Sequence, residues 1–266
     1  MELVDTHAHL FSLHVPVNEV LKRAYEAGVT RIICIGSAEG LQSAHEAIKF
    51  TNYTGNSNLD TLTTNLPTIW ATVGIHPHSA GDYQSVLELE HLLENKSVVA
   101  VGETGLDFFR DWAPFDKQEE LFKNSVSLAL NKNLPLVIHS RDAKEKTLSI
   151  LKDMKAYKVG GVFHCYAYDA EFAKKLLDIN FKISFTGALS FANATNLRQA
   201  AKEIKLSQIM LETDCPYMAP VPFRGKPSEP MHVLEIAKTI SNIKDISLDE
   251  VATVTTNNAL QLFKIL

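Results

Sequence analysis

Eight short apolar runs, distributed along the whole chain, constrain most strongly what this sequence can fold into. They lie near Leu3–Asp5, Arg31–Ile35, Ile69–Val73, Val98–Val101, Leu136–Ile138, Gly161–Phe163, Lys182–Phe185 and Ile209–Leu211. Short, continuous apolar runs are typical of strands that are buried on both faces, as in a parallel sheet. The runs therefore predict eight buried parallel strands.

Segments with apolar residues at helical spacing separate these runs. They are Val17–Ala27, Gln42–Phe50, Val86–Glu94, Phe115–Lys132, Ala143–Met154, Ala170–Leu177, Leu197–Ile204 and Met231–Ser241, and a capping box at Ser247–Glu250 opens a last helix. Strand–helix alternation in 266 residues predicts an α/β fold, a single-domain (β/α)8 TIM barrel over residues 1–266. A doubly wound open sheet is the alternative. The barrel is favoured because polar residues follow strands throughout the chain, and only a barrel brings all strand ends to one mouth.

Composition narrows the class of protein. Hydrophobic residues make up 45% of the chain, enough for a large core, and Cys34, Cys165 and Cys215 form no CxxC pattern. Such cysteine usage favours a reducing compartment. No basic leader and no membrane-length apolar run is visible, so we expect a cytoplasmic protein without a membrane partner. The net charge of −5 argues against a broad basic track along duplex nucleic acid, but not against an enzyme that holds one strand end.

Polar residues at the ends of the predicted strands indicate a metal site. His7 and His9 lie two apart, so in an extended strand their side chains point to the same face. Further candidates follow other runs; they are Glu103, His139, His164 and Asp214. Four histidines and two carboxylates exceed what one tetrahedral ion with an open position takes, and suit two ions that share a carboxylate. We expect one ion on His7, His9, Glu103 and Asp214, and the other on Glu103, His139 and His164.

Side-chain alternation adds to this expectation. Asp5, His7 and His9 are spaced two residues apart, so in a regular strand their side chains point to the same face. If Asp5 faces the barrel interior, His7 and His9 should face it too. A lone histidine at a strand end is more often an ordinary hydrogen-bonded residue, but so many histidines and acids facing one cavity would be costly without cations. We expect His76 to contact substrate and His78 to be structural. Glu212 is a candidate to orient a metal-bound histidine.

Two loops differ in expected role. Cys215–Pro230 follows the last strand and carries five of the ten prolines, which favour a fixed shape. Its cations Arg224 and Lys226 are suited to binding phosphate, although plain loop rigidity is the alternative. Thr51–Leu66 is polar and precedes a strand, so we interpret it as a tolerated surface insertion away from the chemistry.

The motifs together resemble the TatD family of metal-dependent deoxyribonucleases, within the metal-dependent amidohydrolase superfamily. The matching segments occur in order along nearly the whole chain: Asp5–His9, Gly74–His78, Gly102–Asp107, Ile138–Arg141, Phe163–Tyr166, Glu212–Pro216 and Pro220–Lys226. The resemblance implies a binuclear TIM barrel that hydrolyses DNA phosphodiesters, typically as an exonuclease on the 3′ end of single strands. Ser228 stands where such proteins often have Asn, and an Arg is lacking near Leu262, which affects the expected substrate preference more than the chemistry.

The expected mechanism follows. Asp214 would orient the attacking water and take its proton, with Glu103 bridging the two ions. Arg224, Lys226 and Arg141 would hold phosphate, and Phe108, Phe109 or Trp112 would stack a terminal base. Histidine ligands favour zinc or manganese, whereas the resemblance points to magnesium.

The expected partner is therefore a single-stranded DNA end, with no obligate protein partner. Two alternatives stay open. One is a binuclear amidohydrolase or aminoacyl-tRNA deacylase acting on a non-DNA substrate. The other is a catalytically idle nucleic-acid adaptor that binds without turnover.

Overall fold

Eight parallel strands form the centre of the molecule. The computed structural model describes residues 1–38, 40–53, 65–82 and 89–265. The strands are β1 (Leu3–Ala8), β2 (Val29–Gly36), β3 (Thr68–Val73), β4 (Val98–Asp107), β5 (Leu136–Arg141), β6 (Gly161–Phe163), β7 (Phe181–Phe185) and β8 (Ile209–Leu211). Each pairs in parallel with the next along the chain, and Ala8 of β1 bridges to Cys215 after β8. The predicted (β/α)8 barrel is confirmed, and all strands end at one mouth.

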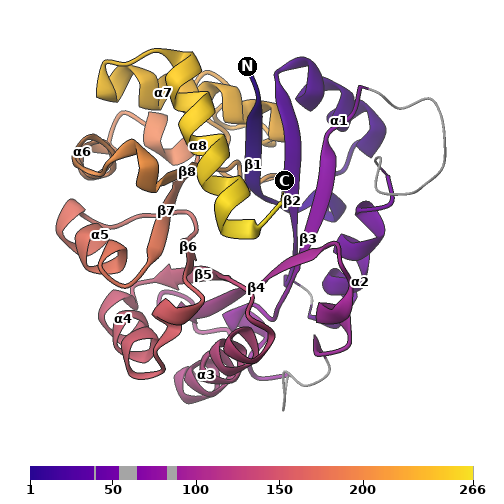
Figure 1. Cartoon of the computed structure of the whole chain (residues 1–266), viewed down its shortest axis with the longest axis vertical. Helices are drawn as coiled ribbons and strands as arrows, with labels where there is room; N and C mark the ends of the chain where they lie inside the picture. The colour runs from indigo at the N-terminus through magenta and orange to yellow at the C-terminus, as the bar shows by residue number, and fades with distance from the viewer. Residues whose placement is uncertain (39, 54–64, 83–88, 266) are drawn as a thin grey trace.

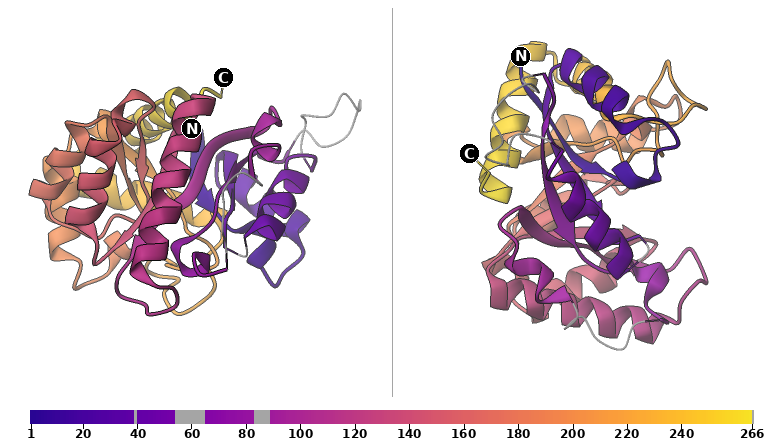
Figure 2. Two further views of the ribbon diagram at one scale, coloured as in Figure 1. Left: turned by 90° about the horizontal axis from the view of Figure 1, so that it is seen from below. Right: turned by 90° about the vertical axis from the view of Figure 1, so that its right-hand side faces the viewer.

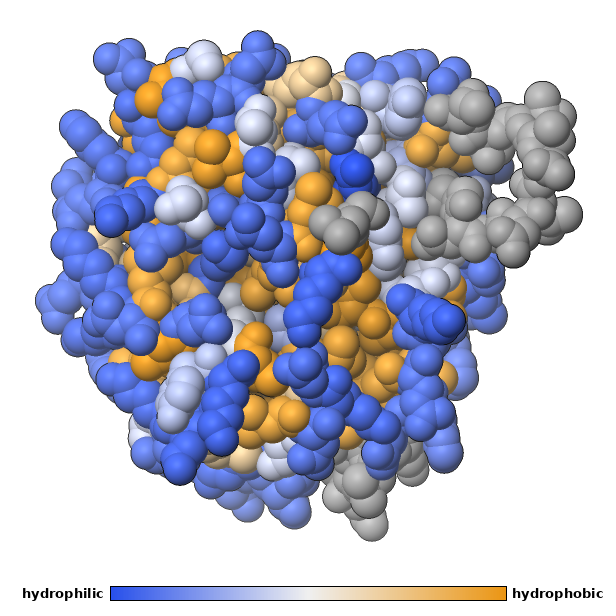
Figure 3. Space-filling view, viewed as in Figure 1, coloured by the Kyte–Doolittle hydropathy of each residue, from blue (hydrophilic) through white to orange (hydrophobic). Residues whose placement is uncertain are grey.

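Helices surround the strands (Figures 1 and 2). They are α1 (Val17–Glu26), α2 (Leu41–Phe50), α3 (Phe115–Lys132), α4 (Lys144–Asp153), α5 (Ala170–Leu177), α6 (Thr195–Glu203), α7 (Val233–Lys244) and α8 (Leu248–Phe263). Short 3-10 turns lie between them, including η1 (Leu10–Ser12) after β1, η5 (Ala156–Lys158) before β6 and η8 (Pro230–His232) before α7. No helix in the described part of the chain is both long and apolar enough to cross a membrane. On the face seen in Figure 3, hydrophobic residues are interspersed among hydrophilic ones.

One predicted helix is wrong in its described part. In residues 89–94 the structure has 3-10 geometry, including η4 (Leu92–Glu94), and residues 86–88 lie outside the described residues. The side chain of Asn95 accepts a hydrogen bond from the Ser97 amide (2.9 Å), which turns the chain directly into β4. Most of the Thr51–Leu66 loop, residues 54–64, also lies outside the described residues.

The barrel has an apolar interior distinct from the layer between strands and helices. The interior cluster joins strand residues such as Val4, Val99 and Met210 to Phe263 and Ile265 at the end of α8, and contains no residue of α1–α7. Helix α8 accordingly lies over the strands at the centre of Figure 1. This packing fills one end of the barrel and leaves the other end for polar side chains.

Two strands change register where they carry polar residues. In β1, Asp5 pairs with Ile32 and Ala8 with Cys34, so β1 holds one more residue than β2 over this stretch. Such a bulge re-aims the side chains beyond it. The predicted shared orientation of Asp5 and His7 is therefore wrong, because Asp5 bonds instead to the amide and hydroxyl of Thr213.

A second bulge lies in β4. Gly102 pairs with Val137 and Thr104 with Ile138, which leaves Glu103 as the additional residue. Ala100 belongs to the interior cluster and Val101 to the layer under the helices, so strict alternation from there would turn Glu103 toward the helices as well. The bulge reverses that orientation and brings the Glu103 carboxylate into the barrel mouth.

Candidate metal centre

A first group of candidate ligands centres on the two histidines of the opening segment. The Nε2 atoms of His7 and His9 lie 3.3 Å apart. Asp214 Oδ1 lies 3.7 Å from His7 Nε2 and 3.5 Å from His9 Nε2, and Glu103 Oε2 lies 3.6 Å from His7 Nε2. The predicted first set is thus brought together from β1, β4 and the loop after β8.

These distances fit a divalent cation. Two ligand nitrogens at about 2.0–2.1 Å from a tetrahedral zinc are separated by about 3.3 Å, the spacing of the two Nε2 atoms. Imidazole nitrogens and carboxylate oxygens are common ligands of zinc, manganese and iron. The donor atoms of the first group therefore suit one metal ion.

A second group of candidate ligands shares Glu103. Its Oε1 lies 2.9 Å from His139 Nδ1 and 3.1 Å from His164 Nε2. His76 Nε2 is 3.5 Å from the same oxygen, so His76, expected from the sequence to contact substrate, also lies within this group. Because Glu103 faces one group with each oxygen, its carboxylate has the placement of a bridging ligand.

Two carboxylates outside the predicted ligand set, those of Asp107 and Glu212, hold histidine rings in their orientations. Asp107 Oδ2 lies 3.0 Å from His139 Nε2 and 2.9 Å from His78 Nε2. Glu212 Oε1 lies 3.0 Å from His164 Nδ1, the contact anticipated for Glu212. Such outer carboxylates orient the ring and raise its basicity as a ligand. Asp107 was given no role from the sequence, although it closes the Gly102–Asp107 motif and lies on the same strand as Glu103.

The electrostatics of the groups also suit a cation. Burial alone would raise the pKa of Glu103, but His164 and His76 hold it well below its usual range. Burial opposes a charge on His164, yet Glu212 and Glu103 raise its pKa well above the ordinary histidine value. Burial lowers the pKa of His76 to about 4, and it also lowers the pKa of His7. The carboxylates thus stabilise positive charge at the centre, and the lowered pKa values of His7 and His76 favour the neutral imidazole that binds a metal.

The three predicted phosphate-binding cations lie outside both ligand groups. Arg141, at the end of β5, stacks over the Phe109 ring at 3.8 Å. Arg224 lies 4.3 Å above the ring of Phe191. Lys226 lines a cavity of about 660 Å³ formed mainly by the proline-rich loop. They are exposed around the mouth rather than at its centre.

Exposed aromatic rings and guanidinium groups form a surface beside the second group, here called the aromatic shelf (Phe109, Arg110, Trp112 and Arg141). Phe109 is 54% exposed and Trp112 63% exposed. Arg110 lies over both rings, at 5.3 and 5.2 Å, and the Trp112 ring meets that of His78 at 4.2 Å. Of the three aromatic residues named as alternatives for stacking a base, Phe108 packs against Phe115, which leaves Phe109 and Trp112 as the exposed candidates.

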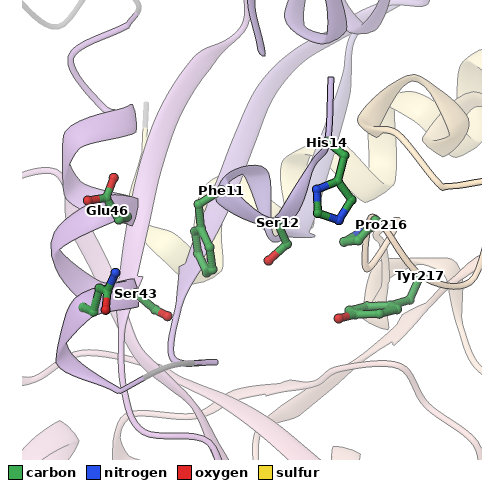
Figure 4. A pocket seen from close by; sticks show the side chains of 8 residues that line it. Phe11, Ser12, His14, Ser43, Glu46, Pro216 and Tyr217 are labelled. Carbon is green, nitrogen blue, oxygen red and sulfur yellow. The ribbon is translucent and has the colours of Figure 1, made fainter. Parts of the chain in front are cut away.

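A cavity of about 490 Å³ adjoins the first group on the other side of the mouth (Figure 4). It is lined by η1, α2 and the start of the loop after β8, through Phe11, Ser12, His14, Gln42, Ser43, Glu46, Pro216 and Tyr217. This cavity could not be predicted from the sequence, since no periodicity or motif links η1 to α2. We refer to this cavity as the Phe11–Tyr217 pocket.

Removal of bound metal is expected to lower the melting temperature by roughly 5–10 °C. A ligand at 100 times its Kd stabilises a protein by about 2.7 kcal/mol, and each kcal/mol shifts the midpoint of a chain of this size by about 2–4 °C. The measurement is thermal unfolding with and without a chelator, and re-addition of zinc or manganese is the control. An unchanged midpoint after complete metal removal would show that the two groups bind no stabilising ion.

Comparisons with known proteins agree with this centre. A family model described as "TatD related DNase" matches residues 4–264. The chain is 38% identical over 268 aligned residues, 99% of each chain, to a Bacillus subtilis protein named uncharacterized metal-dependent hydrolase YabD. It is 31% identical to the 3′-5′ ssDNA/RNA exonuclease TatD of Edwardsiella piscicida, over 96% of this chain and 95% of that one.

Among solved structures, YJJV, a TatD homolog from Escherichia coli, matches with a TM-score of 0.84 and 27% identity, over 99% of this chain and 98% of that chain. The family match thus spans the barrel and every strand end that contributes to the mouth. The chain belongs to the TatD family of metal-dependent hydrolases, enzymes that act on ester bonds.

Proposed function

We propose that this protein is a deoxyribonuclease that removes nucleotides from the 3′ end of single-stranded DNA, with two divalent ions per chain. The observation that carries the proposal is the position of Glu103, whose Oε2 lies near His7 and whose Oε1 lies near His139 and His164, within two adjoining groups of ligand atoms. Paired ions that share a carboxylate are typical of enzymes that cleave phosphodiesters. The exonuclease name of the Edwardsiella relative supports the same substrate class.

The ligand assignment follows the two groups. His7, His9, Glu103 and Asp214 would hold the first ion, and Glu103, His139 and His164 the second, with zinc, manganese and magnesium as candidates. When bound, such ions lower the pKa of a water from 15.7 to about 7 and neutralise charge on a phosphate. His76 is near enough to the second group to act as a further ligand or to contact the phosphate.

Asp214 would accept the proton of the attacking water. Its side chain is 14% exposed, whereas that of Glu103 is only 3% exposed. A general base must lie within hydrogen-bond reach of the water whose proton it takes. Glu103 is enclosed by histidines and is therefore suited to orienting the ligands rather than to exchanging protons with the mouth.

The aromatic shelf suits a single strand. Each base stacked on an aromatic ring contributes about 1–3 kcal/mol, and a base must be unpaired or splayed out to stack in this way. Arg110 and Arg141 place positive charge against the same rings, where the phosphates of the strand would pass. These contacts favour an unpaired strand over a duplex.

The proposal is tested with a 5′-labelled single strand, the matching duplex, an RNA strand and a panel of cyclic amides, each with magnesium, manganese or zinc. We expect the single DNA strand to shorten stepwise from its 3′ end in a metal-dependent reaction. Turnover of an amide with DNA left intact would instead favour an amidohydrolase. Binding of DNA without any turnover would favour the adaptor alternative.

Replacement of Arg224 with alanine is expected to weaken binding of the strand and to flatten its salt dependence. Loss of one phosphate contact on a single strand reduces the slope of log K against log salt by about 0.7. The matched control is Arg31→Ala, which removes an arginine paired with Glu2 at the opposite end of the barrel. An unchanged slope in Arg224→Ala would assign this arginine to packing on Phe191 alone.

A further inference from the structure

We propose that the Phe11–Tyr217 pocket binds the nucleobase of the 3′-terminal nucleotide, the one that the reaction releases. This inference rests on the proposed nuclease function and adds a substrate subsite to it. It starts from the position of the pocket. The rings of Phe11 and Tyr217 each meet the His9 ring edge-on, with centroids 6.1 and 6.4 Å away. Both walls of the pocket therefore touch a candidate ligand of the first ion.

The backbone ties the same walls to the reacting centre. The amide of Tyr217 donates to the carbonyl of Asp214 (2.8 Å), and the amide of His9 donates to the carbonyl of Cys215 (3.0 Å). Phe11 follows His9 by two residues, and Tyr217 follows Asp214 by three. A group held in this pocket lies next to the bond that the first ligand group would attack.

The lining selects an uncharged, flat group. None of the eight residues that line it is a lysine or arginine, and its one carboxylate, Glu46, is ion-paired with Lys49, so the lining offers no free cation to a phosphate. In Figure 4, Ser12 lies between Phe11 and Tyr217, while Ser43 and Glu46 project from α2. Aromatic walls suit the face of a base, and hydroxyl, amide and carboxylate groups suit its edge.

Two of these polar groups are available to a ligand. Neither the Ser12 hydroxyl nor the Gln42 amide makes a hydrogen bond to another side chain or backbone group in the described ranges of the chain. The cavity volume of about 490 Å³ lies within the usual range of about 300–1,000 Å³ for small-molecule sites. In the proposed orientation the base lies toward α2 and the phosphate toward the ion that His9 and Asp214 would hold.

The terminal position follows from what lies on either side of the centre. Helix α2 lines the far side of the pocket, so a strand running on in that direction would meet the helix. The opposite side of the mouth carries the exposed aromatic shelf, where further nucleotides find room. A strand that crosses the ligand groups thus has one end in the pocket and its continuation on the shelf.

The test uses single strands that are identical except for the last nucleotide, which carries either a base or an abasic sugar. We expect Tyr217→Ala to lower kcat/KM on the normal strand by roughly five- to 100-fold, the range for loss of one base–aromatic stack. On the abasic strand the same variant should match the wild-type protein. Tyr217→Phe keeps the ring and should keep most of the activity on the normal strand.

Tyr157→Ala is the matched control, since Tyr157 is similarly exposed but lies in η5, before β6 and away from the mouth. An equal loss in Tyr217→Ala on both strands, or a wild-type protein that ignores the missing terminal base, would overturn the pocket assignment. So would a larger effect of an abasic sugar at the penultimate position. A wild-type protein that degrades no DNA at all would instead overturn the nuclease function, so the two failures are distinguishable.

Discussion

Replacement of Glu103 with glutamine is expected to lower the rate of strand hydrolysis by more than about 100-fold and to reduce the metal content per chain. Loss of an outer partner of a metal ligand already costs about 10–100-fold in affinity or activity, and Glu103 contacts both groups directly. Glutamine preserves the shape of the side chain but supplies only one acceptor oxygen and no negative charge. The amide NH₂ group of the glutamine would also point at the imidazole nitrogens of one ligand group.

The measurement is elemental analysis of the purified variant together with the rate on a single-stranded substrate. Glu203→Gln is the matched control, because Glu203 is a surface acid paired with Lys174. A Glu103→Gln protein that keeps its full metal content and its rate would exclude a shared ligand at this position. Equal melting temperatures of the variant and the wild-type protein, both measured with a chelator present, would show that the substitution leaves the fold intact.

Replacement of Asp214 with asparagine is expected to lower hydrolysis by about 100- to 10,000-fold, the usual contribution of a general base. The choice of asparagine matters because Asp214 has a φ of 57°, in the left-handed region. Asparagine adopts that conformation readily, whereas alanine would add backbone strain. The change thus removes the charge and the proton acceptor without disturbing the start of the proline-rich loop.

The rate of this variant is measured on the same single strand, at metal concentrations high enough to saturate the wild-type protein. The Glu103–His139–His164 group is untouched, so the variant should retain an ion there. The matched control is Asp116→Asn, which changes an exposed acid in the first turn of α3 that belongs to neither ligand group. Near-normal turnover by Asp214→Asn would assign proton transfer to another residue.

Much of the barrel was predictable because its strands are buried on both faces and therefore appear as continuous apolar runs. The two ligand groups were predictable for the same reason, since His139 and His164 follow such runs and parallel strands end at one mouth. The failed expectations have a physical cause. Strict alternation of side chains along β1 predicts the same orientation for Asp5 and His7. The bulge between Asp5 and Ala8 changes that orientation, and no residue in the local sequence indicates the bulge.

Contacts between segments that are distant along the chain could not be predicted from the sequence either. The role of Asp107 depends on the rings of His78 and His139, which come from different strand ends. The Phe11–Tyr217 pocket likewise needs η1, α2 and the loop after β8 to meet, and each contributes ordinary loop or helix residues. The described part of the predicted helix Val86–Glu94 had apolar residues at suitable spacing, and the turn at Asn95 that follows it depends on a side-chain contact with the Ser97 amide.

The added residue in β1 and the one in β4 each divide their strand into two parts, and the inward–outward alternation of side chains in one part does not determine that in the other. Below each bulge the alternation is fixed by the apolar filling of the barrel, and above it by the ligands. The ligand residues at the barrel mouth can therefore change while the apolar residues that fill the other end keep their alternation. Anyone who grafts this centre onto another eight-stranded scaffold must transfer those two extra residues with it, or His7 and Glu103 will face the surrounding helices.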